Sequence, residues 1–409
     1  MGGHEGGSGE DAARRREAAL RGCRLVLGAG GRGSVAELVA RLGSAAEEFA
    51  GDGKQPDTYG DGLVEELERE VAGLLGMADA AFFPTGTMAQ QVALRAWAGR
   101  TGNDVVALHP LAHPEVHERG ALKAVTSLRT VYPTRQPRLP SADEVRDFEE
   151  PFGTLMLELP LRDAGFVLPT WDELTATVAA ARERDAVVHF DGARLWECPP
   201  HFGRPLTEIA GLADSVYVSF YKSLEGISGA ALAGSAELIA EAKAWRHRYG
   251  GLVFQQFPAV LAALSGLRHE LPRLPSYVAH AKPVARALRE GLAEGGLTWP
   301  RVHPAEPHTH QFQLWLPYPA DVLNEAALRQ AEQDGISLFG RAQFHEPGLP
   351  GLSMTELTIA APALEWTEQD ARDAAVSFAR YVADVAETTD ATETTDATDA
   401  SAADSPTAD

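Results

Sequence analysis

Two short apolar runs constrain more than any other feature how this chain can fold. Residues 186–190 (Ala-Val-Val-His-Phe) and 215–220 (Ser-Val-Tyr-Val-Ser-Phe) are rich in β-branched and aromatic residues, which predicts two buried strands. Asp191 follows the first run directly, and Lys222 follows the second after one further residue. Ligands of open α/β sheets bind at the carboxyl ends of the strands. We therefore expect Asp191 and Lys222 to lie at a ligand site.

This pair of side chains suits pyridoxal 5'-phosphate. That cofactor takes a lysine amine for its Schiff base and an acidic partner that keeps its ring nitrogen protonated. The alternative interpretation is that Asp191 and Lys222 are ordinary charged residues at the edges of loops. The two strands by themselves leave both interpretations open.

The composition is that of a globular protein. With 409 residues, of which 44% are hydrophobic and 23% charged, the chain can bury a sizeable core and form two domains. A net charge of -22 argues against a nucleic-acid or anionic membrane partner. Two cysteines, Cys23 and Cys198, are too few for a disulfide framework or a Cys-rich zinc module. No apolar run approaches the roughly 20 residues that cross a bilayer, and the polar first ten residues contain no secretory signal, so we expect a cytoplasmic protein.

Strand and helix patterns alternate along the middle of the chain. This alternation predicts an α/β fold with a mainly parallel sheet covered on both faces. The predicted strands lie at 80–83, 104–108, 154–159, 186–190 and 215–220, and the predicted helices at 63–75, 88–94 and 171–184. Helical patterns dominate from 236 to about 296, and strands at 311–316 and 356–360 then alternate with helices at 320–335 and 367–385. The last part indicates a smaller α+β domain.

These patterns divide the chain into five parts. We predict a disordered N-terminus (1–12), an N-terminal segment (13–56), a large cofactor-binding domain (57–275), a small C-terminal domain (276–386) and a disordered acidic tail (387–409). The first part is rich in glycine, and the last consists mainly of Thr, Ala, Asp and Glu without Lys or Arg.

Two glycine-containing segments could bind phosphate. Residues 28–33 fit G-x-G-x-x-G after a strand-like run, but the second strand with its acidic residue, which a dinucleotide site requires, does not follow. A dinucleotide-binding oxidoreductase is therefore a remote alternative. Residues 84–87 (Pro-Thr-Gly-Thr) precede a predicted helix, whose N-terminus would favour a phosphate. The alternative for this segment is a threonine N-cap without a ligand.

Histidines cluster at 109, 113 and 117. The spacing of His113 and His117, with Pro114 in a first helical turn, is compatible with a zinc pair. A single histidine stacked on an aromatic ring is the alternative, and we expect no metal.

Several motifs occur in the order and at the separations of a known family: 57–61 (Asp-Thr-Tyr-Gly-Asp), 83–88 (Phe-Pro-Thr-Gly-Thr-Met), His113, 191–194 (Asp-Gly-Ala-Arg) and 219–222 (Ser-Phe-Tyr-Lys). Together they resemble the threonine aldolase and β-eliminating lyase family of pyridoxal-phosphate enzymes. The resemblance implies the aspartate-aminotransferase-like fold (fold type I), pyridoxal 5'-phosphate as cofactor, an amino acid as substrate, and a homodimer or homotetramer.

The resemblance also implies roles for individual residues. Lys222 resembles the Schiff-base lysine, Asp191 the partner of the pyridine nitrogen, and His113 the histidine that stacks on the cofactor ring. Gly86 and Thr87 resemble the phosphate-binding loop, and Arg194 a residue beside the cofactor and the substrate carboxylate. Tyr59 resembles a substrate-binding residue in the part of the site that two subunits share.

The chain departs from the family pattern at several positions. The N-terminal Arg-Ser-Asp-Thr stretch of threonine aldolases has no clear counterpart. Residues 158–160 (Glu-Leu-Pro) replace a Glu-Asn-Thr strand end, and Phe254 stands where the family has an arginine. Residues 356–361 lack the late arginine that holds the substrate carboxylate. Arg341 could replace it from the small domain, although an arginine of a surface loop is the alternative.

The implied activity is retro-aldol cleavage of a β-hydroxy-α-amino acid to glycine and an aldehyde. The hydroxyl would lose its proton to a base, for which His113 and His117 are candidates. Phe254 makes the site less cationic, which favours a bulkier substrate such as an aryl-serine over threonine. β-Elimination from a β-substituted amino acid, and a catalytically reduced relative that only binds the cofactor, remain alternatives.

Overall fold

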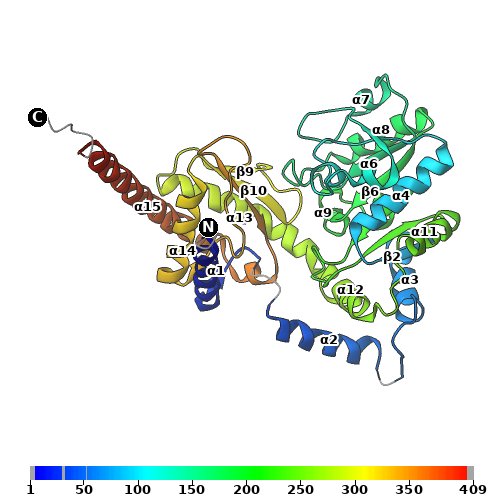
Figure 1. The fold of residues 1–409 in the computed structure, drawn as a ribbon, viewed down its shortest axis with the longest axis horizontal. Coiled ribbons are helices and arrows are strands. Elements are labelled where there is room, and N and C mark those ends of the chain that lie inside the picture. Colours follow the sequence, from blue (N-terminus) through cyan, green and yellow to red (C-terminus); the bar gives the residue numbers. More distant parts are fainter. Residues whose placement is uncertain (1–4, 30–32, 52, 403–409) are drawn as a thin grey trace, which may run out of the picture. The chain divides into compact units, whose positions relative to one another are not determined.

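The computed structural model describes residues 5–29, 33–51 and 53–402 (Figure 1). The chain forms two compact units. One comprises Arg32–Val278, and the other combines Met1–Gly31 with Ala279–Asp409. The structure thus divides the predicted N-terminal segment, 13–56, between the two units.

The larger unit is built on a seven-stranded sheet with the order β2-β8-β7-β6-β5-β3-β4. Strands β7, β6, β5, β3 and β4 are parallel, and β8 runs antiparallel to both of its neighbours, β7 and β2. The strand bounds are β2 Asp79–Phe83, β3 Val105–Ala107, β4 Arg129–Val131, β5 Thr154–Glu158, β6 Val187–Gly192, β7 Ser215–Ser219 and β8 Ala230–Gly234. The predicted mainly parallel α/β sheet is confirmed.

The sequence analysis did not predict β8 or β4. β8 has the sequence Ala-Ala-Leu-Ala-Gly, without β-branched or aromatic residues, yet every residue of it is buried. Small side chains suit a strand placed between β2 and β7, because burial and cross-strand packing outweigh intrinsic strand propensity there.

Helices surround this sheet, and local signals explain where several of them begin and end. Thr170 and Glu173 form a capping box at the start of α8, and Gly76 adopts the left-handed conformation that ends α3. The helices of this unit are α2 Val35–Phe49, α3 Leu63–Leu75, α4 Gly86–Thr101, α5 His113–Val116, α6 Ala121–Thr126, α7 Ala142–Arg146, α8 Trp171–Glu183, α9 Pro199–Phe202, α10 Leu206–Ala210, α11 Ala236–Arg248 and α12 Phe257–His269, with short 3-10 turns at Leu195–Glu197 and Leu271–Arg273.

The smaller unit contains an antiparallel three-stranded sheet with the order β12-β10-β9 and a parallel pair, β1 with β11. Its elements are α1 Glu5–Gly22, β1 Leu25–Val26, α13 Leu274–Glu294 (within which the division between the units falls), β9 Arg301–His303, β10 Gln311–Leu316, α14 Ala320–Asp334, β11 Ile336–Ser337, β12 Ser353–Thr358, a 3-10 turn at Ala361–Glu365 and α15 Glu368–Ala402. Phe312, Phe339 and Phe378 are buried in its core.

The chain ends differ from the prediction. Helix α1 begins at Glu5, where we expected disorder through residue 12, and Arg15 binds Glu325 and Glu332 of α14. Helix α15 continues to Ala402, where we expected disorder from residue 387. The tail contains alanine and neither Gly nor Pro up to Ala402, so its sequence permits a helix. Residues 1–4 and 403–409 lie outside the described residues.

The glycine-rich segment at 28–33 does not belong to a dinucleotide-binding unit in the described structure. The strand before it, Leu25–Val26, pairs with Ile336–Ser337 in the two-stranded sheet. A Cβ atom on Gly28 would lie 2.6 Å from the carbonyl oxygen of Phe339, so close backbone packing explains this glycine. Residues 30–32 of the motif lie outside the described residues.

Candidate active site

Three neighbouring parallel strands end at the same edge of the sheet and place polar residues there. Glu158 ends β5 and is the register partner of Asp191 on β6, and Asp191 in turn is the partner of Tyr217 on β7. Lys222 follows β7 by three residues. The structure therefore places Asp191 and Lys222 at neighbouring strand ends, as the sequence predicted.

The loops after β6 and β7 are tied together by side chains. The Ser219 hydroxyl donates to the Ala193 carbonyl (2.8 Å), and the Trp196 indole donates to the Ser219 carbonyl (2.9 Å). The hydroxyl of Ser223, beside the lysine, donates to the buried Glu197 carboxylate. These contacts fix the backbone on which Lys222 is carried.

Lys222 has an unusual electrostatic environment. Burial and the nearby positive charge of Arg194 lower its pKa to about 8, against the opposing influence of Asp191 and Glu158. Burial raises the pKa of Asp191, and the charge of Lys222 opposes that rise. A lysine with a lowered pKa has a larger fraction of neutral, nucleophilic amine near neutral pH than an exposed lysine.

Glu158 is a further buried carboxylate at this edge, and we did not predict a role for it. Burial and the charge of Asp191 raise its pKa to about 7. Its two oxygens accept the backbone N–H groups of His113 (2.8 Å) and Arg162 (3.3 Å). Glu158 thus holds the segment after β3 against the turn after β5. Like Asp191, Glu158 lies at the end of a predicted buried strand, and this position could have identified it as a candidate site residue.

His113 begins α5 in the loop after β3. Its Nδ1 lies 3.3 Å from Oε1 of Glu118, a buried carboxylate whose other oxygen accepts from the Gln91 amide. The charge of His113 also lowers the pKa of Asp191, against the larger effect of burial, which raises it. His113 therefore lies at the site with its ring next to the Glu118 carboxylate.

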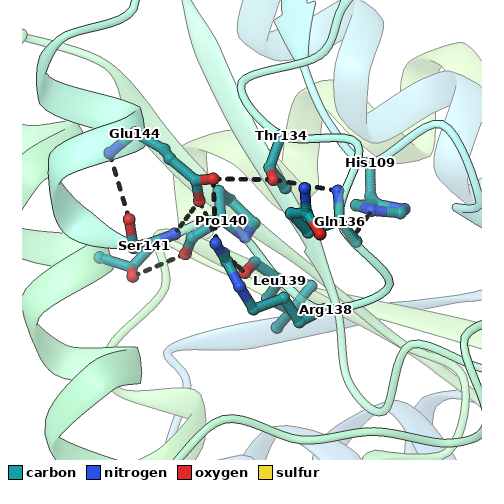
Figure 2. A network of polar contacts seen from close by, with 9 residues as sticks. His109, Thr134, Gln136, Arg138, Leu139, Pro140, Ser141 and Glu144 are labelled. Atoms are coloured by element: carbon teal, nitrogen blue, oxygen red, sulfur yellow. Dashed lines mark hydrogen bonds and ion pairs between the residues drawn. The ribbon is translucent and has the colours of Figure 1, made fainter.

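A polar network holds the start of this loop (Figure 2). His109 Nε2 lies 2.7 Å from the backbone carbonyl oxygen of Gln136, and His109 Nδ1 accepts the backbone N–H of Leu111 at 3.0 Å. A carbonyl only accepts, so the ring carries its proton on Nε2 and is neutral. Arg138 and Glu144 form a paired contact in the same network, and Arg138 lowers the pKa of Glu144 to about 2.

Gly86 and Thr87 open helix α4, which follows β2. Thr85 is the N-cap and accepts the Met88 N–H at 3.2 Å, so the threonine-cap interpretation holds for that residue. It does not explain the glycine. A Cβ atom on Gly86 would lie 2.1 Å from the Tyr217 hydroxyl oxygen, so a larger residue at this position would require the Tyr217 side chain or the helix N-terminus to shift.

Arg194 lies in the loop after β6. Its Nε is buried and has no hydrogen-bond partner among the residues that the structure describes, and its guanidinium lies 5.3 Å from the centre of the Phe166 ring. A buried, unsatisfied donor on a charged side chain is costly unless a ligand completes it. Arg341 is an exposed residue of the other compact unit, so its approach to this site stays a prediction.

Tyr59 belongs to a surface region where two of the family-like segments meet. Its N–H donates to the Phe254 carbonyl (2.9 Å), and the two exposed rings form an edge-to-face pair with centres 5.4 Å apart. Asp57 is buried and accepts the N–H groups of Gln256 (2.8 Å) and Phe257 (2.7 Å). The structure therefore joins the segment at 57–61 to the segment around Phe254.

His113 and His117 each face a different carboxylate, Glu118 for the first and Asp163 for the second. Within the described parts of the chain, no group of three or more His, Cys, Asp or Glu side chains is arranged to hold a metal ion. Over the same residues, no helix is long and apolar enough to cross a membrane.

The residues present fit pyridoxal 5'-phosphate. A lysine of lowered pKa can bind an aldehyde carbon, and a buried carboxylate can pair with a protonated ring nitrogen. A helix N-terminus that begins with a closely packed glycine can bind phosphate. The unsatisfied Nε of Arg194 provides an additional donor for an anionic group.

The parallel sheet with a lysine and an aspartate at adjacent strand ends defines an enzyme of the fold type I class. Within that class the chain belongs to the beta-eliminating lyase family, whose sequence profile matches residues 43–313. The low specificity L-threonine aldolase of Escherichia coli (strain K12) is 30% identical over 250 residues, which cover 58% of this chain and 73% of the relative.

Two solved structures resemble the whole fold. A Listeria monocytogenes EGD-E protein to which L-allo-threonine aldolase activity is ascribed is 30% identical, with a TM-score of 0.81 over 90% of this chain and 99% of that chain. An Exiguobacterium protein, described as an aromatic amino acid beta-eliminating lyase/threonine aldolase, is 34% identical, with a TM-score of 0.79 over the same shares. The predicted family and fold class are confirmed.

Proposed function

We propose that this chain is a pyridoxal 5'-phosphate-dependent carbon–carbon lyase that cleaves a β-hydroxy-α-amino acid to glycine and an aldehyde. The observation that carries the proposal is the amine of Lys222, whose pKa is lowered to about 8 beside Asp191, Glu158 and Arg194. The threonine aldolase names of its relatives support the reaction class.

When bound, the cofactor supplies an electron sink for the pair of electrons released at the substrate Cα. Lys222 would hold it covalently through its amine, and Asp191 would keep its ring nitrogen protonated. Gly86 and Thr87 would bind its phosphate at the start of α4, and His113, oriented by Glu118, would lie against its ring. These assignments follow the family resemblance, and the juxtaposition of the strand ends supports them.

Arg194 would bind the substrate carboxylate. Its buried Nε has no partner within the described residues, so an incoming carboxylate would complete its hydrogen bonds. Arg341 remains our candidate for a second carboxylate contact from the other unit.

We propose a substrate bulkier than threonine. The family resemblance assigns Tyr59 and the position of Phe254 to the site. Their exposed, paired rings would give it an apolar edge in place of the cationic contact that an arginine at 254 would give. An aryl-serine has the β-hydroxyl for cleavage and a ring for this edge. β-Elimination on a β-substituted amino acid is the second candidate reaction, which the family name and the description of the Exiguobacterium relative favour.

A substrate panel tests these proposals. Purified protein loaded with pyridoxal 5'-phosphate should form glycine and an aldehyde from β-hydroxy amino acids, fastest from an aryl-serine. Keto acid and ammonia from β-substituted amino acids would favour elimination. Threonine cleavage faster than that of every other substrate would contradict the preference for bulk, and no turnover with bound cofactor would favour a catalytically reduced relative.

We also propose that the chain forms a homodimer or homotetramer in the cytoplasm. The exposed side chains of Tyr59, Val253 and Phe254 form an apolar surface that a second copy could cover. Light scattering should give at least a dimer for the wild type and a lower mass for Phe254→Glu. A monomeric wild type would contradict the assembly. Finding the protein in the membrane fraction of lysed cells, or in the culture medium, would contradict the location.

A further inference from the structure

His117 has a carboxylate partner that none of the roles above explains. Its Nε2 lies 2.7 Å from Oδ2 of Asp163, and its ring centre lies 5.2 Å from the ring centre of His113. The His117 side chain is 37% exposed, so solvent reaches it. The two histidines are therefore neighbours in contact with different acids: Glu118 for His113 and Asp163 for His117.

Glu158 explains why His117 and Asp163 meet. It accepts the N–H groups of His113 and Arg162 and so holds the start of α5 against the turn that contains Asp163. This turn follows the end of β5, where Glu158 is the register partner of Asp191 on β6, and β6 pairs with the strand that leads to Lys222. The charge of Arg162 also contributes to the lowered pKa of Lys222. His117 thus belongs to the same group of loops as Lys222.

The contacts of His117 determine which ring nitrogen carries the proton. Nε2 lies 2.7 Å from the Asp163 carboxylate, which accepts, and 3.3 Å from Nη1 of Arg162, which only donates. One nitrogen cannot serve both partners. The shorter, charge-assisted bond to the carboxylate is the stronger one, so Nε2 carries the proton. The lone pair of Nδ1 is then available as a base.

We propose that Nδ1 of His117 is the base that takes the proton of the substrate β-hydroxyl, and that Asp163 is its positioning residue. The inference rests on the proposed aldol cleavage. As the O–H proton moves to Nδ1, the O–H electron pair becomes the second C–O bond of the aldehyde and the Cα–Cβ bond breaks. Its electron pair stays with the glycine fragment, which takes up a proton at Cα. The exposed ring of His117 returns its own proton to solvent.

This arrangement separates two tasks. His113, held by Glu118, is free to stack on the cofactor, whereas His117, held by Asp163, handles the substrate proton. A base oriented by a third group is the usual arrangement in acid–base catalysis.

The test compares two reactions of the cofactor-loaded, full-length enzyme. Cleavage of an aryl-serine needs removal of the hydroxyl proton, whereas exchange of the glycine α-proton with deuterium oxide, followed by NMR, does not. His117→Gln and Asp163→Asn should lower kcat for cleavage by about 10²-fold and leave exchange within about twofold. His269→Gln is the matched control. His269, the last residue of α12, also pairs with a carboxylate, that of Glu48 at 2.9 Å, and this substitution should change neither rate.

A second measurement needs no cofactor. The nitrogen-15 NMR signals of the His117 ring, identified by their loss in His117→Gln, should show a proton on Nε2 in the wild type. In Asp163→Asn they should show a mixture of the two tautomers. A third measurement uses the cofactor-loaded enzyme again: imidazole added to His117→Ala should restore part of the cleavage rate.

The outcomes separate this inference from the proposed function. It is overturned if His117→Gln cleaves as fast as the wild type, if cleavage and exchange fall equally, or if the wild-type ring carries its proton on Nδ1. A wild type that exchanges the glycine proton but cleaves no β-hydroxy amino acid would instead overturn the aldol function, and this inference with it.

Discussion

Glu158 and Asp191 are register partners on adjacent parallel strands, so two buried carboxylates lie side by side next to Lys222. Burial raises the pKa of both carboxylates, the charge of Asp191 raises that of Glu158 further, and the positive charge of Lys222 lowers both. The arrangement makes the stability of the larger unit sensitive to pH.

The first prediction concerns this pH dependence. The pKa of Glu158 is about 7 in the folded protein and lies above its ordinary value of 4.5. The folded state therefore binds the Glu158 proton more tightly than the unfolded state does. This tighter binding stabilises the fold fully below pH 4.5, and the stabilisation is lost as the pH rises through 7. The free energy of unfolding of the wild type, relative to Glu158→Gln, should fall between these pH values by at most about 3 kcal/mol.

Urea unfolding of both proteins from pH 4.5 to 8 gives this difference. The buried, neutral His189, whose pKa burial lowers to about 3, contributes the opposite slope but is common to both proteins and cancels. Exposed Glu149 is the control, since Glu149→Gln should leave the slope unchanged. A difference that is constant with pH would contradict the raised pKa of Glu158.

The second prediction concerns Lys222. Lys222→Ala should remove the visible absorption that the wild type acquires with pyridoxal 5'-phosphate and lower turnover by at least about 10³-fold. Lys123→Ala, at an exposed lysine on α6, should retain both. A wild type that takes up no added cofactor would refute the cofactor assignment itself.

The third prediction concerns the approach of α4 to β7. Gly86→Ala places a methyl group against the Tyr217 hydroxyl and should cost about 1–3 kcal/mol, with weaker binding of pyridoxal 5'-phosphate. Gly99→Ala in the same helix meets no atom within 4 Å and should instead stabilise the fold by about 0.5–1 kcal/mol. Thermal unfolding and cofactor titration measure the two effects.

Removing the obstructing oxygen checks the cause of that loss. Gly86→Ala combined with Tyr217→Phe should recover part of the stability, because the hydroxyl makes the closest contact. Equal stability of the single and double variants would show that the contact does not limit the helix position.

The fourth prediction separates two arginines. Arg194→Gln should raise KM for the amino acid about 10- to 100-fold, because a charged contact of about 1.5–3 kcal/mol is lost. Arg341→Gln should raise KM by a smaller factor if that residue supplies the second carboxylate contact. Steady-state kinetics give both values, and an unchanged KM in Arg341→Gln would make Arg341 an ordinary surface residue.

The sequence predicted β6, which carries Asp191, and β7, which leads to Lys222, because long apolar side chains and β-branched residues mark buried parallel strands. It did not predict β8, whose small residues are specified by the neighbouring strands β2 and β7. It also did not predict that α1 begins as early as Glu5 or that α15 continues to Ala402, because the composition of both segments is typical of disorder.

The site was predicted to a similar extent. Residues that belong to short motifs, such as Gly86 and Lys222, could be identified from their local sequence. The contact of Glu158 with His113, and the pairing of His117 with Asp163, join segments 45 or more positions apart, and only the fold brings them together. The obstruction at Gly86 likewise depends on Tyr217, a residue of a distant strand.

The pairing of β1 with β11 has a consequence for how the chain folds as it is synthesised. Leu25 finds its partner only at Ile336, whereas every strand of the seven-stranded sheet lies between Asp79 and Gly234. The sheet of the larger unit can therefore form while the ribosome is still translating the C-terminal third. Strand β1, although it is synthesised early, stays unpaired until β11 has been synthesised.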